Sequence, residues 1–167
     1  MAQDRPIRPV DDPISFPYGA IYSAETVAKY GMRHNDHRGV DFACRIGTKA
    51  KAVVSGVIQH QGWDEGGWGN FLVLQNGRDY YIYCHLSEFL TKIGQRVNQG
   101  DYIVLTGNSS RTGMNTQEHL HIEHHEDDLS PAGVRPLLFY DPNKPKLGGY
   151  SCLDSDYAYL ESLGYVV

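Results

Sequence analysis

The chain has 167 residues, of which 41% are hydrophobic, and its formal net charge is −5. This length and composition predict one folded domain with a substantial core and exclude a disordered chain. The acidic balance offers no basic face to nucleic acid, and no apolar run approaches the roughly 20 residues that span a bilayer.

The first segment, residues 1–17, is polar and rich in proline, and we expect it to form an arm. It lacks the apolar stretch of a secretory signal, so the sequence predicts no signal peptide. A short helix is expected over residues 23–30, because Ser23 is a suitable N-cap and Gly31 follows the last turn.

Short strands are expected between about residues 40 and 125, where apolar and aromatic runs alternate with turns. The runs are residues 51–60, 70–75, 79–86, 101–106 and 119–125. Asn76-Gly77, between two of them, is a strong hairpin signal. The pattern predicts a mainly β fold, a compact antiparallel sheet or sandwich, with a second short helix over residues 154–163 near the C-terminus.

The sequence HRGVD places His37 four residues before Asp41. This spacing puts both side chains on one face of a strand or of a helix, and Gly39 favours an extended or bent backbone. Standing alone, the pair would be interpreted as a surface histidine beside an aspartate. Nearby His34 lies off the motif, and we expect His60 at the surface.

The sequence YCHL contains the second candidate histidine. In a continuous strand, His85 and Tyr83 share a face and Cys84 points the other way. This geometry excludes a hydrolase that pairs Cys84 with His85, because adjacent strand residues point apart. The chain has three cysteines, an odd number, so we expect buried free thiols and no disulfide framework.

The sequence HLHIE contains three further candidate site residues, His119, His121 and Glu123. Residues two apart in a strand face the same way, so His119, His121 and Glu123 are expected on one face, with Leu120 and Ile122 toward the core. Glu123 could accept a hydrogen bond from a histidine N–H. The alternative is an edge strand with solvent-facing histidines. The next two residues, His124 and His125, are expected at the rim.

Taken in order, H-x-G-x-D, Y-x-H-L and H-L-H-x-E resemble the motifs of the lysostaphin-type zinc metallopeptidases of bacterial cell walls. The resemblance runs over about residues 37–123 and includes the connecting segments GWGNFLVLQ and IGQRVNQGDYIVLTG. It implies a small antiparallel β fold with a narrow groove over the zinc ion. The zinc ligands that it implies are His37, Asp41 and His121, and the catalytic pair around the bound water is His85 and His119.

One segment departs from the family pattern. The loop over residues 109–118 is longer than the family's, and Gln117-Glu118 stand where a Gly-Pro usually precedes H-L-H. We expect this loop to form a wall of the groove and to influence substrate choice. Gly113 and Asn115 predict that it is mobile and rich in turns.

The leading interpretation is a zinc-dependent endopeptidase that hydrolyses peptide bonds in peptidoglycan through a metal-activated water. It divides the chain into an N-terminal arm and short helix (residues 1–33), a peptidase core (residues 34–126) and a C-terminal extension packed on the core (residues 127–167). The alternative is a catalytically silent peptidoglycan-binding or regulatory module on the same fold. A biotinyl or phosphohistidine carrier domain leaves HRGVD unexplained.

The expected partners are peptidoglycan peptides. A virus of bacteria could encode such a leaderless, single-domain form, which would act from its tail or particle or at lysis. The sequence leaves open the bond that is cleaved, the wall type, the oligomeric state, and which of His85 and His119 is the general base.

Overall fold

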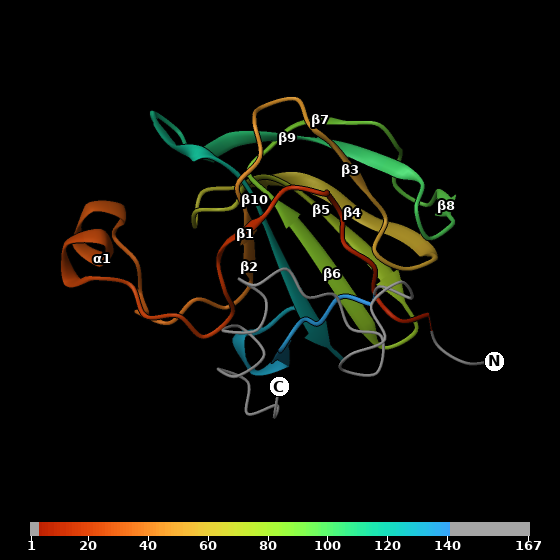
Figure 1. Ribbon diagram of the computed structural model, residues 1–167, viewed down its shortest axis with the longest axis horizontal. Helices are drawn as coiled ribbons and strands as arrows, with labels where there is room; N and C mark the ends of the chain where they lie inside the picture. The colour runs from red at the N-terminus through yellow and green to blue at the C-terminus, as the bar shows by residue number, and fades with distance from the viewer. Residues whose placement is uncertain (1–3, 141–167) are drawn as a thin grey trace.

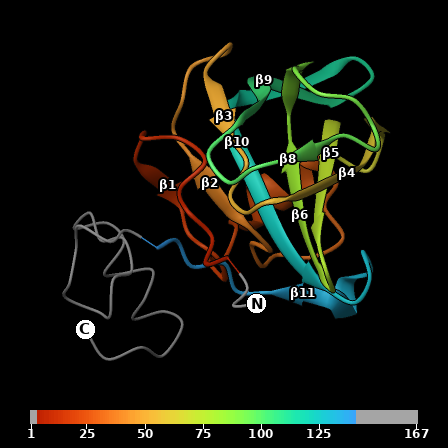
Figure 2. The same ribbon diagram turned by 90° about the vertical axis from the view of Figure 1, so that its right-hand side faces the viewer.

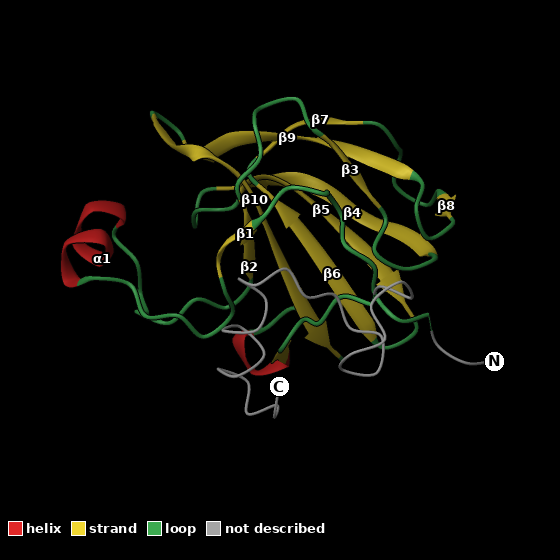
Figure 3. Ribbon diagram, in the orientation of Figure 1, coloured by secondary structure: helices red, strands yellow, loops and turns green. Residues whose placement is uncertain are grey.

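The computed structural model describes residues 4–140; the expected helix over residues 154–163 and the third cysteine, Cys152, lie outside them. Strands dominate the described chain (Figures 1 and 3), as expected for a mainly β fold. No helix of this part is long and apolar enough to cross a membrane. In chain order, the elements are β1 (Ile14–Phe16), α1 (Ala24–Tyr30), β2 (Val40–Phe42), β3 (Lys49–Lys51), β4 (Gly56–Asp64), β5 (Gly69–Asn76), β6 (Asp79–Cys84), β7 (Leu86–Phe89), β8 (Arg96–Val97), β9 (Tyr102–Arg111), β10 (Met114–Glu126), the 3₁₀ turn η1 (Pro131–Gly133) and β11 (Val134–Arg135).

The strands form one antiparallel sheet whose longest member is β10. The order β1-β2-β10-β6-β5-β4-β8 places β10 between β2 and β6, which come from distant parts of the sequence (Figure 2). β9 pairs with β3, with β7 and with the first part of β10. The middle of β10 is therefore held on both sides by neighbouring strands, one of which carries the HRGVD motif.

The two faces of the sheet are buried to different extents. Leu72, Tyr83 and Ile122 face the main core, and Ile103 and Val104 of β9 pack into the same cluster. The other face holds a small buried cluster, which Trp68, Phe71 and Tyr80 cover; its members are Val73, Ile82 and Cys84. The register pairs His121 with Cys84, so His121 lies on the face of this small cluster.

Two local predictions are confirmed by their hydrogen bonds. The Ser23 side chain accepts a hydrogen bond from the Thr26 backbone N–H at the start of α1, and Gly31 ends the helix in the left-handed conformation. β5 and β6 form the expected hairpin, with Asn76 paired to Asp79 and Gly77 at a φ of 60° in the turn.

Two of the expected strand runs are interrupted. The run over residues 51–60 divides into β3 and β4, because the Val53 N–H donates to the Tyr83 hydroxyl and the Val53 carbonyl accepts from the Ile7 N–H. A side chain and the N-terminal arm thus satisfy backbone groups that a strand would pair. The run over residues 79–86 divides at His85, whose φ is 61°.

Segments at both ends of the described chain contribute to the main core. Val10 and Ile14 of the arm are buried there, together with Leu137 and Phe139 near its other end. The rings of Phe139 and Phe42 pack edge to face, with 5.4 Å between their centroids. Phe42 follows Asp41 in β2, so these end segments support the strand that carries a candidate ligand.

Candidate metal centre

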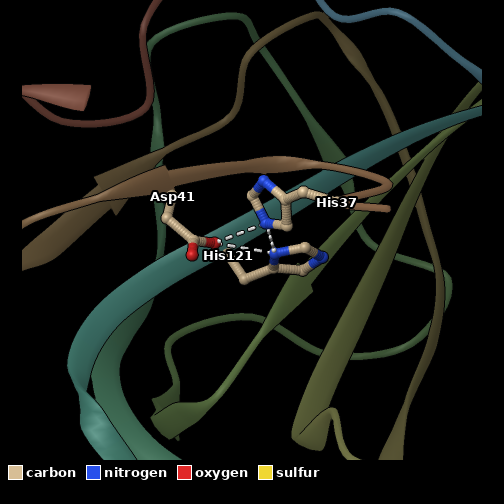
Figure 4. Close-up of side chains that lie close together, drawn as sticks. All are labelled: His37, Asp41 and His121. Atoms are coloured by element: carbon tan, nitrogen blue, oxygen red, sulfur yellow. Dashed lines mark hydrogen bonds and ion pairs between the residues drawn. The ribbon is translucent and has the colours of Figure 1, made fainter. Parts of the chain in front are cut away.

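Three side chains from HRGVD and HLHIE converge at the junction of β2 and β10. His37 precedes β2, while Asp41 on β2 lies directly opposite His121 on β10 in the sheet register. The His121 Nδ1 atom is 2.8 Å from Asp41 Oδ1, and the His37 Nε2 atom is 3.1 Å from the same oxygen. The two nitrogens are 3.0 Å apart (Figure 4). The structure therefore brings together the three predicted ligands, in a largely buried position.

Each of these two imidazoles is anchored through its other nitrogen. His37 donates from Nδ1 to the Pro17 carbonyl at 2.9 Å, and His121 donates from Nε2 to Glu123 at 2.9 Å. These bonds leave His37 Nε2 and His121 Nδ1 as the ring atoms that face Asp41, and each can bind a metal ion once it carries no proton. Two imidazole nitrogens and a carboxylate oxygen that lie this close together fit a divalent cation such as Zn²⁺.

The carboxylates around His121 favour a positive charge at the point where the three side chains converge. Burial opposes protonation of the ring, but the hydrogen bonds with Asp41 and Glu123 outweigh it and raise the pKa of His121 to about 10. The pKa of Asp41 is held well below its usual range, because His37 and His121 outweigh the effect of its own burial. A metal ion at Nδ1 of His121 would take the place of the proton.

Gly39 explains the glycine of the H-x-G-x-D motif. A Cβ atom at this position would lie 2.4 Å from the Ile122 carbonyl oxygen and 2.7 Å from His121 Cε1. Both distances are shorter than van der Waals contact, and one of the two atoms belongs to the backbone of β10. Only glycine allows the segment between His37 and Asp41 to pass this close to His121.

His85 and His119 lie beside the three converging residues. Their ring centroids are 4.6 Å apart, and His119 Nε2 is 3.7 Å from Asp41 Oδ1. Each ring donates from Nδ1 to a carbonyl at 2.7 Å, His85 to Ser109 and His119 to Gln117, so the Nε2 lone pair of each is left for chemistry. Burial, then the neighbouring His119 and His121, lower the pKa of His85 to about 3, so its ring is neutral near pH 7.

The predicted facing of Tyr83 and His85 is wrong. Tyr83 points into the main core, where its hydroxyl donates to the Lys51 carbonyl, whereas the left-handed backbone of His85 turns its ring toward His119. Cys84 consequently lies on the same side of the sheet as His121. It is nevertheless a core thiol, as predicted, because it is fully buried and burial raises its pKa well above the usual value.

Glu123 confirms the predicted hydrogen bond to a histidine, and it has two further partners that the sequence analysis missed. Trp68 donates to it from Nε1 at 3.1 Å, and His125 donates from Nε2 at 2.7 Å. The expected rim position of His125 is wrong, because only 2% of this residue is exposed. The alternation that places His121 and Glu123 on one face also places His125 there, and this signal was available in the sequence.

The remaining histidines take no part in the centre. His34 donates to the Asp36 carbonyl at 2.7 Å and is not among the converging residues. His60 is exposed, as expected, and His124 packs against Tyr81 on the opposite face of the sheet.

The segment over residues 109–118 is a hairpin rather than the expected turn-rich loop. β9 and β10 pair up to Arg111 and Met114, so only Thr112 and Gly113 form the turn. Glu65 ties this turn to the segment after β4, because it accepts from the Thr112 N–H at 3.0 Å and from the Thr112 hydroxyl. The register of β9 and β10 is irregular between Asn115 and His119.

Comparisons with known proteins agree with this geometry. The sequence model described as "Peptidase family M23" matches residues 35–132. The chain is 40% identical over 106 residues to an uncharacterised metalloprotease of Haemophilus influenzae, covering 63% of this chain and 21% of that protein. It is 38% identical over 112 residues to lysostaphin of Staphylococcus simulans, covering 65% of this chain and 22% of lysostaphin.

Solved structures give the same relationship. The catalytic domain of lysostaphin from Staphylococcus simulans superposes with a TM-score of 0.65 at 30% identity, over 75% of this chain and 89% of that domain. A zinc-containing peptidase from Vibrio cholerae superposes with a TM-score of 0.63 at 27% identity, over 75% of this chain and 38% of that protein. The chain spans about a quarter of the length of the curated relatives that it matches, between 21% and 27% for the first three.

Proposed function

The chain belongs to peptidase family M23, and from this membership and the geometry of the site we propose that it is a zinc-dependent endopeptidase that hydrolyses peptide bonds in peptidoglycan. The observation that carries the proposal is the convergence of His37, Asp41 and His121, with the free nitrogens of His85 and His119 beside them. Three metal ligands and two adjacent proton-transfer groups are the parts that metal-assisted hydrolysis needs.

In this proposal, His37 Nε2, Asp41 and His121 Nδ1 hold the zinc ion. Zinc bound there would polarise the scissile carbonyl and make water a nucleophile near neutral pH. Glu123 orients His121 and makes its ring more basic through the hydrogen bond to Nε2. Phe16 packs on the His37 ring with 4.9 Å between centroids, which restricts its rotation.

His85 and His119 supply the proton transfers and the stabilisation of negative charge. Each holds a proton on Nδ1 through its carbonyl partner, so Nε2 can accept a proton from the attacking water and later donate one to the leaving amine. The second imidazole of the pair can stabilise the developing oxyanion. We assign both roles to this pair without dividing them between the two residues.

The substrate class is proposed from the relatives. One is the glycyl-glycine endopeptidase ALE-1 of Staphylococcus capitis, 38% identical over 102 residues, and another is the peptidoglycan DD-endopeptidase ShyA of Vibrio cholerae, 42% identical over 88 residues. A catalytically silent wall-binding module remains the alternative, but it would have no need of a complete ligand set with two further histidines. Action from a virus particle or at lysis stays a proposal from the sequence, which immunodetection in purified particles would test.

Digestion of purified cell walls tests the proposal. The full chain, loaded with zinc, is incubated with glycine-bridged walls and with directly cross-linked walls, and the released peptides are identified by mass spectrometry. We expect new peptide termini from at least one wall type, their loss with a chelator, recovery when zinc is restored, and no release by His121→Ala. Release that persists in the chelator, or none from either wall by the zinc-loaded protein, would overturn the proposal.

A further inference from the structure

Three side chains of β10 form a continuous buried row that begins at the metal centre. His121, Glu123 and His125 alternate along the strand and so share one face. Their residues are 8%, 5% and 2% exposed. The row lies on the face of the small apolar cluster, with Glu123 paired across the sheet to Ile82. A carboxylate in such surroundings needs every one of its oxygens hydrogen-bonded.

Glu123 satisfies this need with donors on both oxygens. Oε1 accepts from His121 Nε2 at 2.9 Å and from Trp68 Nε1 at 3.1 Å. Oε2 accepts from His125 Nε2 at 2.7 Å, the shortest of the three bonds. The orientation of the carboxylate is therefore fixed from both sides, by the candidate metal ligand on one oxygen and by His125 on the other.

His125 is itself held in place from behind. Its Nδ1 lies 3.2 Å from the Ser130 carbonyl, which comes from the turn after β10. The ring thus spans the distance from this turn to Glu123, at the far end of the row from His37 and Asp41. Removing the ring would leave Oε2 of a buried carboxylate without its donor, and the carboxylate would then be free to rotate away from His121.

We propose that His125 is a positioning residue of the metal centre. It holds Glu123 Oε2, which keeps Oε1 on His121 Nε2 and keeps His121 Nδ1 directed at His37 and Asp41. This inference rests on the proposed zinc site and extends it to a residue that lies outside hydrogen-bond reach of the three ligands. The neighbouring His124 provides a matched comparison, because it points to the opposite face and bonds to Asp79 and the Pro136 carbonyl.

The test measures zinc affinity in the folded full-length protein, by competition with a chromophoric chelator, for His125→Leu, His125→Gln and His124→Leu. We expect about 10- to 100-fold weaker zinc binding in His125→Leu, the usual effect of losing a partner that orients a metal ligand. His125→Gln should recover much of the affinity, because its amide nitrogen replaces Nε2. His124→Leu should bind zinc as the parent does.

The melting temperature of each metal-free variant separates positioning from general support of the fold. If His125 only supported the fold, the zinc affinity of each variant would follow its melting temperature. His124→Leu and His125→Leu with equal melting temperatures would then bind zinc equally, and that result would overturn the inference. If His125→Leu does not fold, His125→Asn is compared with His125→Gln instead, because the shorter amide of asparagine does not reach Glu123. Equal zinc affinities of these two variants would then overturn the inference. A parent protein that binds no zinc would instead refute the proposed function.

Discussion

His85 has a backbone conformation that residues other than glycine rarely adopt. At a φ of 61° it lies in the left-handed region, which costs a non-glycine residue roughly 1–2 kcal/mol. The conformation ends β6 at Cys84 and turns the His85 ring out of the strand pattern, so that it packs against the ring of His119. Strain at this residue is thus linked to the geometry of the candidate catalytic pair.

His85→Ala and His119→Ala should each keep one zinc per chain and lose roughly 10²- to 10⁴-fold in the rate of wall-peptide release, the usual contribution of a proton-transfer or oxyanion group. Neither side chain is among the three converging residues that could hold a metal ion. Elemental analysis and single-turnover rates measure the two effects. If either variant lost its zinc, that histidine would have to be reassigned as a ligand.

Gly39→Ala should weaken the candidate metal centre although it removes none of the three side chains that converge there. The added Cβ would meet the Ile122 carbonyl oxygen at 2.4 Å, so β10 or the HRGVD segment must move. We expect the free energy of unfolding to fall by about 1–3 kcal/mol, the range for overpacking, and zinc to bind more weakly. Gly62→Ala is the control, because the atoms nearest to its Cβ would belong to the side chains of His60, at 3.2 Å, and Phe71, at 3.5 Å. Unchanged zinc affinity in Gly39→Ala would show that the close approach is not required.

At the scale of elements, the sequence predicted what short-range patterns encode. Apolar and aromatic runs placed β5 and β6, alternation placed the second half of β10, and the helix caps placed α1 to within one residue. It could not predict the interruption at Val53, because the backbone partner there is the hydroxyl of Tyr83, 30 residues away in sequence. It likewise missed Trp68 as a partner of Glu123, 55 residues away, because nothing local to either residue indicates the contact.

The β9–β10 hairpin was predicted as a groove wall but not as an ordered pair of strands. Gly113 and Asn115 are typical turn residues, yet only Thr112 and Gly113 form the turn, and Glu65 holds it from a separate segment. Tertiary contacts outweighed the local turn preference. A shorter wall must therefore lose residues from both arms, since a deletion of residues 114–117 alone would leave the end of β9, at Ser109 and Arg111, without its partners on β10.

Replacing residues 110–115 with a two-residue Asn-Gly turn should change which wall peptides are released and leave zinc stoichiometry unchanged. The hairpin leads directly into His119, and loops on a rigid sheet supply the contacts that distinguish substrates. The ratio of products from glycine-bridged and directly cross-linked walls, measured by mass spectrometry, checks this. An unaltered ratio with zinc intact would place specificity elsewhere in the chain.

The core of the described chain includes residues on both sides of the segment that matches the family. The family match covers residues 35–132, but the core also takes in Val10 and Ile14 before it and Leu137 and Phe139 after it. Ile14 pairs with Phe42 of β2, and the Phe139 ring packs on the same Phe42, so both contact the strand that carries Asp41. The division into an arm, a core over residues 34–126 and an extension remains a prediction. Within the described residues 4–140, the shared packing implies that the segments before and after the family match fold together with it.

Phe139→Ala should lower the free energy of unfolding by about 3–5 kcal/mol, as expected for a large aromatic ring removed from a core. The residue is 4% exposed and its ring packs on Phe42. Leu129→Ala, at a residue that is 40% exposed, should stay within about 0.5 kcal/mol of the parent. Urea unfolding of both variants measures the difference. Equal effects would mean that the segment after residue 132 adds nothing to the core.

The proposed function requires that His37, Asp41 and His121 hold one zinc ion on which hydrolysis depends. The most direct test is to strip the full chain of metal, titrate zinc back, and follow the release of wall peptides at each addition. We expect no activity at the start, a linear rise and a sharp plateau at one equivalent of zinc per chain, with no rise in His121→Ala. Activity in the stripped protein, or a plateau reached equally by His121→Ala, would contradict it.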